Sequence, residues 1–213
     1  MPTAEDCERN KKNVIMAAYR CYLHCGIEGA TQKDIAREAK LTPRSIQRYF
    51  CNRDELVLAV AKYMLSEYNN SVKEYVLQKC PVNMNALEEL GLFLECQKKI
   101  YLENEGIFLL MNELDIYFKR YKQRYLFAMP ELKRLDAMRP YLYSILQRGI
   151  HEGCIYISGD VTDRVELIIA TYTGLFQHFN SKYLVTSGHC RENDIGMFDL
   201  YIHGLKNFLS VPV

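Results

Sequence analysis

The sequence predicts an all-α protein, and three observations lead to this fold class. Apolar residues recur at helical spacing along almost the whole chain of 213 residues. Alternation of the β type occurs only at residues 154–158, which are too few to found a sheet. Capping residues, glycines and prolines divide the rest of the chain into segments with the length of ordinary helices.

The first two helices are expected over residues 8–25 and directly after Thr31. Gly26 is a natural stop for the first, because glycine readily adopts the left-handed backbone found at helix ends. Thr31 and Asp34 form a capping pair at the start of the second helix. The residues expected to face the core are Val14, Ala17, Ala18, Cys21, Tyr22 and Cys25, followed by Ile35, Ala36 and Ala39.

The stretch LTPRSIQRYF, residues 41–50, predicts a short third helix. Thr42 can cap this helix, and Pro43 has the fixed φ that suits the first helical position. Ile46 and Phe50 lie four residues apart and therefore share one inner face. The side chains left on the outside are those of Arg44, Gln47 and Arg48.

A long fourth helix is expected over residues 53–78, because Asn52 and Glu55 repeat the capping signal. The chain is accordingly divided into a three-helix head, residues 1–53, and a helical body, residues 54–213. The fourth helix connects the two.

Further helices are expected beyond Pro81, and no internal repeat or low-complexity run interrupts them. Pro140 lies inside one of these segments, where a proline should kink the helix or mark its true beginning. The expected ranges are 84–103, 106–123, 131–152, 161–185 and 192–209.

The composition is that of an ordinary globular protein, with 49% hydrophobic and 25% charged residues. No run approaches the roughly 18–20 uninterrupted apolar residues of a membrane span. The N-terminus also lacks the apolar segment of a signal peptide. We therefore expect a cytoplasmic protein without a membrane partner.

The eight cysteines are scattered and form no CxxC pair. In a cytoplasmic chain this is typical of reduced thiols that serve in packing. Cys21, His24 and Cys25 fall on one stretch of helix, but no fourth ligand follows at a zinc-like spacing. We expect neither a metal nor a cofactor.

Charge and layout both favour nucleic acid as the partner of the head. Residues 1–53 carry ten Lys/Arg against six Asp/Glu, a net charge of +4, whereas the other 160 residues carry −3. A basic segment on a mildly acidic body points to a polyanionic partner. Two short helices joined by about three residues are also the layout of a DNA-reading helix-turn-helix.

The third helix has side chains suited to the major groove. Arg44 can donate two hydrogen bonds to guanine, and Gln47, one turn on, can pair with adenine. Thr42 and Ser45 suit phosphate or base contacts, and Tyr49 can hydrogen-bond a phosphate. The same polar residues would also suit a solvated helix that merely closes a small core.

Residues 10–60 resemble the DNA-binding domain of the TetR/AcrR family of transcriptional regulators. The resemblance is carried by the run GIEGATQKDIAREAKLTPRSIQRYFCNRDEL, residues 26–56. Shared features are a glycine that ends the first helix, Thr31 before the second, an Ile-Ala pair at 35 and 36, and a Ser/Thr before the recognition helix. The Tyr-Phe pair at 49 and 50, and a basic residue three before a leucine, complete the set.

The resemblance implies which side chains touch DNA. Two departures concern Lys40, where the family often has a turn glycine, and Gln47, where it often has an aromatic residue. A non-glycine residue in a left-handed turn costs roughly 1–2 kcal/mol. With the outward Arg48 and the capping Thr42, the expected DNA contacts are Gln32, Lys33 and Arg53 on phosphates, and Pro43, Arg44, Ser45, Gln47 and Tyr49 in the groove.

The family's helices after the fourth form a variable domain that dimerises and holds a small ligand. Nine aromatic residues lie between positions 101 and 143 of this chain. Most are expected in the core, yet a cavity lined by phenol rings would suit an amphipathic or aromatic ligand. The candidate pocket residues are Tyr101, Phe108, Met111, Asp115, Phe118, Tyr125, Tyr143, Tyr172 and Phe176.

Two C-terminal helices are candidates for a dimer interface. Small residues four apart would let another helix approach closely, and the last helix carries an apolar stripe from Ile195 to Leu209. Two such helices from each subunit could pair around a two-fold axis. Both stripes could instead pack within the monomer. The candidate interface residues are Ala170, Gly174, Gln177, Phe198, Ile202 and Leu205.

These features predict a ligand-responsive repressor that binds a palindromic operator as a homodimer and is released by a small amphipathic or aromatic ligand. The dimer would set its recognition helices about one DNA turn, ~34–36 Å, apart or at a multiple of it. A ligand that shifts the far end of the fourth helix would change this spacing.

Several alternatives stay open. An activator would use the same head, and the body could bind a protein partner in place of a small molecule. An all-α enzyme is a further alternative, although no metal spacing, glycine-rich phosphate loop or nucleophile elbow appears, and we expect no catalytic activity. Redox sensing through Cys21 or Cys51 would predict release of DNA on mild oxidation.

Overall fold

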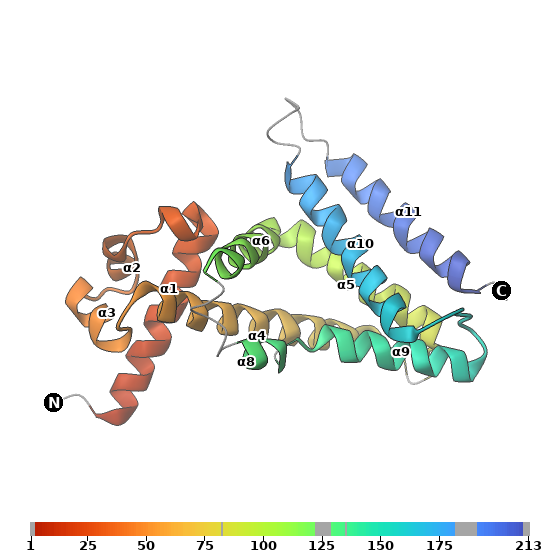
Figure 1. Ribbon diagram of the computed structural model, residues 1–213, viewed down its shortest axis with the longest axis horizontal. Coiled ribbons are helices and arrows are strands. Elements are labelled where there is room, and N and C mark those ends of the chain that lie inside the picture. Colours follow the sequence, from red (N-terminus) through yellow and green to blue (C-terminus); the bar gives the residue numbers. More distant parts are fainter. Residues whose placement is uncertain (1–2, 82, 122–128, 135, 182–190, 211–213) are drawn as a thin grey trace. The chain divides into compact units, whose positions relative to one another are not determined.

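The computed structural model describes residues 3–81, 83–121, 129–134, 136–181 and 191–210. Every regular element in this part of the chain is a helix, which confirms the predicted all-α fold (Figure 1). Residues 154–158 form no strand. None of the described helices combines the length and the apolar character needed to cross a bilayer.

The chain forms two compact units. Unit 1 comprises Met1–Tyr68 and Gly106–Leu135, and unit 2 comprises Asn69–Glu105 and Asp136–Val213. These units are defined by contacts, whereas the predicted head and body are defined by function. The predicted boundary between head and body stays a prediction.

Unit 1 is built on the three N-terminal helices. The first of them starts earlier than expected, because Thr3 and Asp6 form a capping box. Gly26 interrupts its helical path with φ 74° and ψ 167°, close to the expected stop. The helices of unit 1 are α1 (Ala4–Gly29), α2 (Gln32–Glu38), α3 (Pro43–Tyr49), the first part of α4 (Arg53–Lys79), most of α6 (Glu105–Arg120) and α8 (Met129–Arg134).

The core of unit 1 contains a helix that the sequence assigned to the body. Val14 and Val57, from α1 and α4, are fully buried in this core. Leu110, Leu114 and Tyr117 of α6 belong to the same apolar cluster. Burial of apolar surface is the main stabilising term in folding, so α6 contributes to the stability of the helix-turn-helix.

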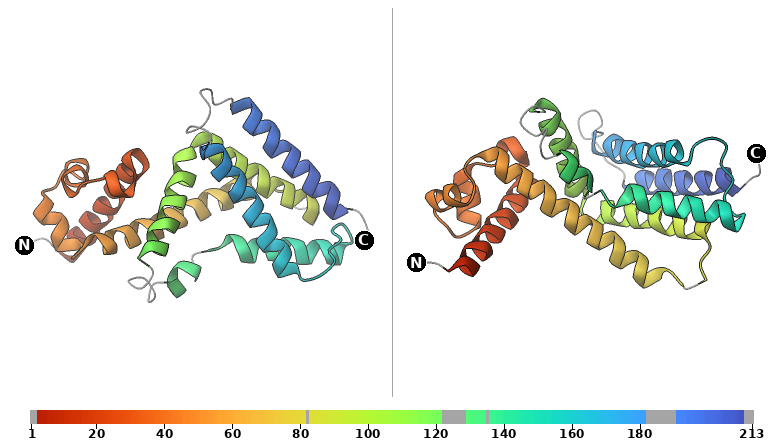
Figure 2. Two further views of the ribbon diagram at one scale, coloured as in Figure 1. Left: turned by 45° about the horizontal axis from the view of Figure 1, so that its top comes forward. Right: turned by 60° about the horizontal axis from the view of Figure 1, so that its bottom comes forward.

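Unit 2 is a helical layer around α5. α5 packs against α9 and α11, and α9 packs against α10. The views in Figures 1 and 2 agree in showing α10 and α11 side by side. The helices of unit 2 are α5 (Ala86–Glu103), α9 (Met138–Glu152), α10 (Val161–Ser181), α11 (Arg191–Ser210) and the second part of α4.

Pro140 marks the beginning of a helix, which is one of the two outcomes that the sequence left open. It lies in the first turn of α9, where a missing backbone N–H costs no helical hydrogen bond. The Asp136 carboxylate accepts a hydrogen bond from the Met138 N–H at 3.2 Å. The expected helix ends at 123 and 185 lie outside the described residues.

Candidate nucleic-acid interface

α3 is short and is held at both ends by local contacts. The Thr42 hydroxyl accepts a hydrogen bond from the Ser45 N–H at 3.1 Å, and Pro43 occupies the first helical position. Ile46 and Phe50 anchor the inner face, with exposures of 2% and 5%. The sequence signals for this helix are therefore confirmed.

The opposite face of α3 is polar. Pro43, Arg44, Gln47 and Arg48 are exposed, as is the capping Thr42. Ser45 and Tyr49 are half-buried, and the Ser45 hydroxyl lies 2.9 Å from that of Thr42. The residues predicted to face a groove thus lie together on one short helix.

Basic side chains in this unit fall into two groups. Arg20 and Arg37 pair with Glu38 and Asp34, at 2.6 and 2.8 Å. Among the residues that the structure describes, no carboxylate pairs with Lys33, Arg44 or Arg48, all of which are exposed. These three cations, like Arg53, are predicted to touch DNA, and their charge is available to a polyanion.

The start of α2 exposes the predicted phosphate contacts. Asp34 and Thr31 form the predicted capping box, with the Asp34 N–H donating to the Thr31 hydroxyl at 3.2 Å. Hydrogen bonds from Thr31, together with the Arg37 charge, lower the pKa of Asp34. Gln32 and Lys33 follow the cap and are both exposed.

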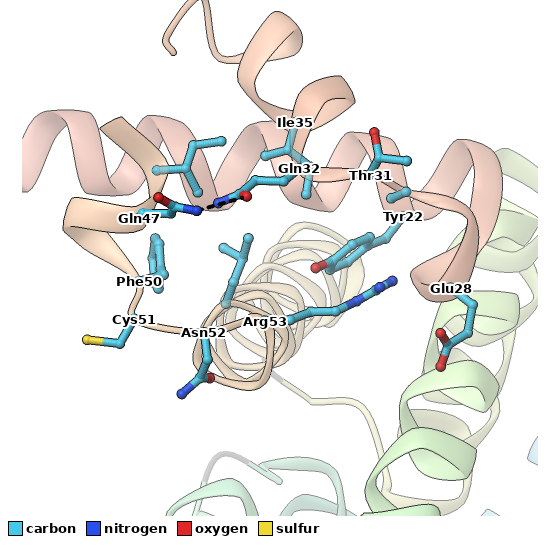
Figure 3. Close-up of a pocket in the computed structure, with 13 residues that line it drawn as sticks. Tyr22, Glu28, Thr31, Gln32, Ile35, Gln47, Phe50, Cys51, Asn52 and Arg53 are labelled. Atoms are coloured by element: carbon cyan, nitrogen blue, oxygen red, sulfur yellow. Dashed lines mark hydrogen bonds between the residues drawn. The ribbon is translucent and has the colours of Figure 1, made fainter. Parts of the chain in front are cut away.

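Gln47 and Gln32 face each other across a short gap. The Gln47 Nε2 donates to the Gln32 Oε1 at 3.4 Å, which Figure 3 shows as a dashed line. The predicted base contact and one predicted phosphate contact therefore lie close together, although they come from different helices.

Arg53 begins α4 and is exposed. Its guanidinium donates a hydrogen bond to the Ile27 carbonyl, which fixes the side chain across the end of α1. Asn52 caps the helix, because its side-chain oxygen accepts from the Glu55 N–H at 2.8 Å. Arg53 is thus placed at a helix N-terminus, where the backbone dipole also favours an anion.

The turn between α2 and α3 is left-handed at a non-glycine residue. Lys40 has φ 56°, as the comparison with the family's turn glycine predicted. The turn is held by the Leu41 N–H, which donates to the Ala36 carbonyl at 2.9 Å, and by the Asn13 side chain, which donates to the Ala39 carbonyl at 2.8 Å. Asn13 carries no sequence signal for this role.

α6 supports the end of α1 and the start of α4, which the sequence did not predict. The Glu113 carboxylate accepts a hydrogen bond from the Ile27 N–H at 2.7 Å. The Tyr117 hydroxyl donates to the Asp54 carboxylate at 2.7 Å. The positive φ of Gly26 favours glycine there, and a Cβ added at this position would lie 2.9 Å from a Glu113 oxygen and would displace the carboxylate that binds the Ile27 N–H.

The predicted ligand residues fall in both units. Tyr101 and Phe176 are stacked in unit 2, with ring centroids 5.0 Å apart, and Tyr172 lies 6.0 Å from Phe176. Tyr143 is 43% exposed. Tyr125 lies outside the described residues. The other four, Phe108, Met111, Asp115 and Phe118, belong to α6 in unit 1.

Unit 2 contains a cavity of about 640 Å³ that none of these residues lines. The buried Glu89 lies on its wall, accepts a hydrogen bond from the Tyr141 hydroxyl at 2.6 Å and pairs with Arg148. The sequence did not single out this cavity, because its walls come from three separate helices. Its apolar lining includes Val72, Val76, Leu77 and Met138.

The predicted interface residues also divide into two groups. Ala170, Gly174 and Gln177 are exposed on α10, whereas Leu205 is half-buried. Phe198 and Ile202 are 1% and 6% exposed and pack inside unit 2, which is the alternative that the sequence left open. The exposed apolar residues of α11 are instead Met197, Leu200 and Phe208.

The N-terminal helices of this chain are similar to those of bacterial transcriptional regulators. The family model described as bacterial regulatory proteins of the tetR family matches residues 14–60. The HTH-type transcriptional regulator PksA of Bacillus subtilis (strain 168) is 31% identical over 78 residues. That match spans 37% of this chain and 38% of the relative.

Solved structures resemble this chain along nearly its whole length. A TetR-family regulator from Agrobacterium tumefaciens has a TM-score of 0.72 at 16% identity and covers 96% of this chain and 100% of its own. A TetR-family regulator from Cytophaga hutchinsonii also has a TM-score of 0.72, at 18% identity, over 97% of this chain and 98% of its own. These likenesses show a shared fold.

Proposed function

We propose that this chain is a repressor of the TetR family of transcriptional regulators, which binds a palindromic operator as a homodimer and leaves it when a small ligand binds; the family match of residues 14–60 and the shared fold support this. The observation that carries the proposal is the division of the basic side chains. The exposed cations around α3 keep their charge available, whereas the neighbouring Arg20 and Arg37 are paired with carboxylates.

In this proposal α3 enters the major groove and reads base edges. Arg44 donates two hydrogen bonds to guanine, and Gln47 pairs with adenine. Gln32, Lys33 and Arg53 bind phosphates at the helix starts beside it and set the register of the head on the duplex. The buried inner face of α3, anchored by Ile46, fixes the position of these side chains relative to the core of unit 1.

The exposed apolar face of unit 2 supports dimerisation. Leu167 on α10 and Leu200 on α11 are 54% and 74% exposed, and Phe208 is 57% exposed. The small residues Ala170 and Gly174 lie one and two turns beyond Leu167 on the same face of α10. A two-fold axis beside α10 and α11 would cover these residues with their own copies.

The cavity in unit 2 is the proposed effector site. Its volume of about 640 Å³ and its mixed lining suit an amphipathic molecule of ordinary ligand size. α4 runs without interruption from Arg53 to Lys79, so one helix starts at the proposed phosphate contact and ends on the cavity wall. A ligand that favours another position of this helix would favour another spacing of the two heads.

Selection of bound duplexes from a random pool, followed by affinity measurement, tests the reading head. Arg44→Ala and Gln47→Ala should each weaken binding to the selected site by about 1–3 kcal/mol and relax its sequence preference. Lys33→Ala should weaken all sequences alike and reduce the salt dependence. Arg37→Ala is the matched control, because Arg37 is an exposed arginine of α2 that is already paired with Asp34.

An operator affinity that is unchanged in the Arg44→Ala, Gln47→Ala double variant would overturn the assignment of α3 as the reading helix. A molecular mass in solution that corresponds to one chain would overturn the dimer.

A further inference from the structure

Unit 1 contains a cavity of its own, of about 450 Å³, between α1, α2, α3 and the start of α4 (Figure 3). Its floor is apolar and buried, since Ile35, Ile46, Phe50 and Leu56 are each at most 5% exposed. Its rim is polar and exposed, and this volume lies in the range of roughly 300–1,000 Å³ typical of ligand sites. The exposed rim residues are Glu28, Thr31, Gln32, Gln47, Cys51, Asn52 and Arg53.

Tyr22 is the one buried residue with a hydroxyl group among those that line this cavity. The residue is 2% exposed, and among the described residues its hydroxyl has no hydrogen-bond partner. Figure 3 shows the phenol and the Arg53 side chain extending beside each other along the cavity wall, with the hydroxyl and the guanidinium at opposite ends. Buried hydroxyls in proteins are normally hydrogen-bonded to protein or to water, so this hydroxyl is available to donate to an acceptor atom.

The protonation state of Tyr22 suits a donor. Burial raises the pKa of its hydroxyl above the ordinary tyrosine value, and the nearby Arg53 charge only partly offsets this effect. The hydroxyl therefore keeps its proton at neutral pH and can donate it to an acceptor.

The charge around the cavity favours an anion. Arg53, which also donates to the Ile27 carbonyl, supplies a positive charge, and the N-terminus of the 27-residue helix α4 adds the positive end of a helix dipole. The two carboxylates in the first turn of α4 do not line the cavity, and both accept hydrogen bonds, that of Asp54 from Tyr117 and that of Glu55 from the Cys51 N–H. Glu28 is the sole carboxylate among the lining residues, and it lies 3.8 Å from the Arg120 guanidinium. An acceptor that is also negatively charged, such as a carboxylate, fits this combination.

We propose that this cavity binds a small amphipathic carboxylate, held between the Tyr22 hydroxyl and the Arg53 guanidinium, and that the bound molecule competes directly with DNA. Its apolar part would cover Ile35 and Phe50 on the floor. The competition rests on the proposed function, because the rim residues Gln32, Gln47 and Arg53 are also the proposed DNA contacts. This site is distinct from the cavity in unit 2, since the two share no lining residue.

Methyl NMR of the full chain, labelled at isoleucine, locates the site directly. Sodium 2-naphthoate is the probe, because it joins a carboxylate to a flat apolar ring system. The methyl signals of Ile35 and Ile46 should shift on titration, whereas those of Ile145 and Ile168, buried in unit 2, should stay in place. Shifts confined to the unit 2 methyls, or no shifts at all, would overturn the proposal.

Two comparisons test the proposed chemistry. The neutral 2-naphthamide should bind at least tenfold more weakly, and equal binding of amide and carboxylate would contradict the anion site. Tyr22→Phe should lose about tenfold in affinity for naphthoate, as expected for one hydrogen bond to a charged group. Unchanged affinity in this variant would remove Tyr22 from the site.

Tyr19→Phe is the matched control for this variant. Tyr19 is a half-buried tyrosine of the same helix that packs edge-on against Tyr63, with ring centroids 5.4 Å apart, and it does not line the cavity. This variant should bind naphthoate as the parent does. A tenfold loss here as well would show that the phenylalanine substitution acts on α1 as a whole and not through a hydroxyl in the cavity.

Competition is measured on the duplex obtained by selection from a random pool. Naphthoate should raise the apparent Kd for this duplex in proportion to its concentration, and a Kd that does not respond would refute direct competition. If no duplex is selected, the proposed function fails while the NMR titration still decides the carboxylate site. If DNA binds but the Ile35 and Ile46 signals stay in place, the carboxylate site alone fails.

Discussion

Substitution of Ile46 by alanine separates the folding role of α3 from its proposed reading role. Ile46 is 2% exposed and is the inner anchor of a helix of only seven residues. The change removes three carbon atoms from the core, which corresponds to roughly 2–3 kcal/mol at about 0.8 kcal/mol per buried methylene. The cavity left behind adds to this loss, so we expect a total cost of about 2–5 kcal/mol in the free energy of unfolding.

The assay is denaturant unfolding of the full chain followed by far-UV circular dichroism. Gln47→Ala is the matched control, because Gln47 is the next residue of α3 and its side chain is exposed. Its free energy of unfolding should stay within about 0.5 kcal/mol of the parent. Ile46→Val should fall between the two, with a cost of about 0.5–1.5 kcal/mol.

Equal free energies of unfolding for Ile46→Ala and the parent would refute this reasoning. That result would mean that α3 is held by its cap and by its neighbours in sequence, and that its inner face contributes little. A large loss of free energy of unfolding in Gln47→Ala would refute the expectation that the polar face of α3 serves binding alone, since this exposed side chain would then have a structural role.

Two further substitutions probe local strain in unit 1. Tyr22→Phe should raise the free energy of unfolding by about 1–3 kcal/mol, because it removes a buried hydroxyl for which the described residues supply no partner. A thermal melt that shows no gain in stability, or the same gain for Tyr19→Phe, would contradict this. Lys40→Gly should stabilise the protein by about 1 kcal/mol, since glycine relieves the left-handed φ of 56° at a smaller entropic cost. Denaturant unfolding checks the second prediction, and a loss of stability would show that Lys40 carries no strain.

The helix-turn-helix was predictable because its signals are local. Thr31, Asp34, Thr42 and Pro43 each act within three residues of their own position, and the structure has α2 and α3 starting where these residues indicate. A cap or a proline acts through backbone groups of one turn, so it can be read from the sequence without knowledge of the fold.

The role of α6 could not be predicted in this way. Glu113 bonds to the backbone of a residue 86 positions earlier, and Tyr117 bonds to Asp54, 63 positions earlier. Periodicity identifies α6 as a helix with an apolar face, but it does not say which core receives that face. The same limit explains why the predicted ligand residues include four from a helix that packs in unit 1.

α11 shows a related limit for the dimer interface. Its apolar residues occupy most of the helix circumference. The sequence alone therefore does not distinguish the apolar residues that pack inside unit 2 from those that stay exposed. Phe198 lies 4.9 Å from Phe176, centroid to centroid, and is therefore part of the core of unit 2. Leu200 and Phe208 occupy the other face and stay exposed. To predict an interface, one must know which apolar residues stay exposed, and this depends on how α11 packs against its own chain.

The two proposed ligand sites would change the operator affinity with a different dependence on ligand concentration. A ligand in the unit 2 cavity acts through a shift between conformations, and such coupling is typically about 1–3 kcal/mol. The operator affinity then falls to a plateau, roughly 5–150-fold below its starting value, once the cavity is saturated. A carboxylate in the cavity of unit 1 excludes DNA from Gln32, Gln47 and Arg53, so the affinity falls with each increase in its concentration and reaches no plateau. The shape of the curve therefore assigns an effector to one of the two cavities even before its position on the protein is known.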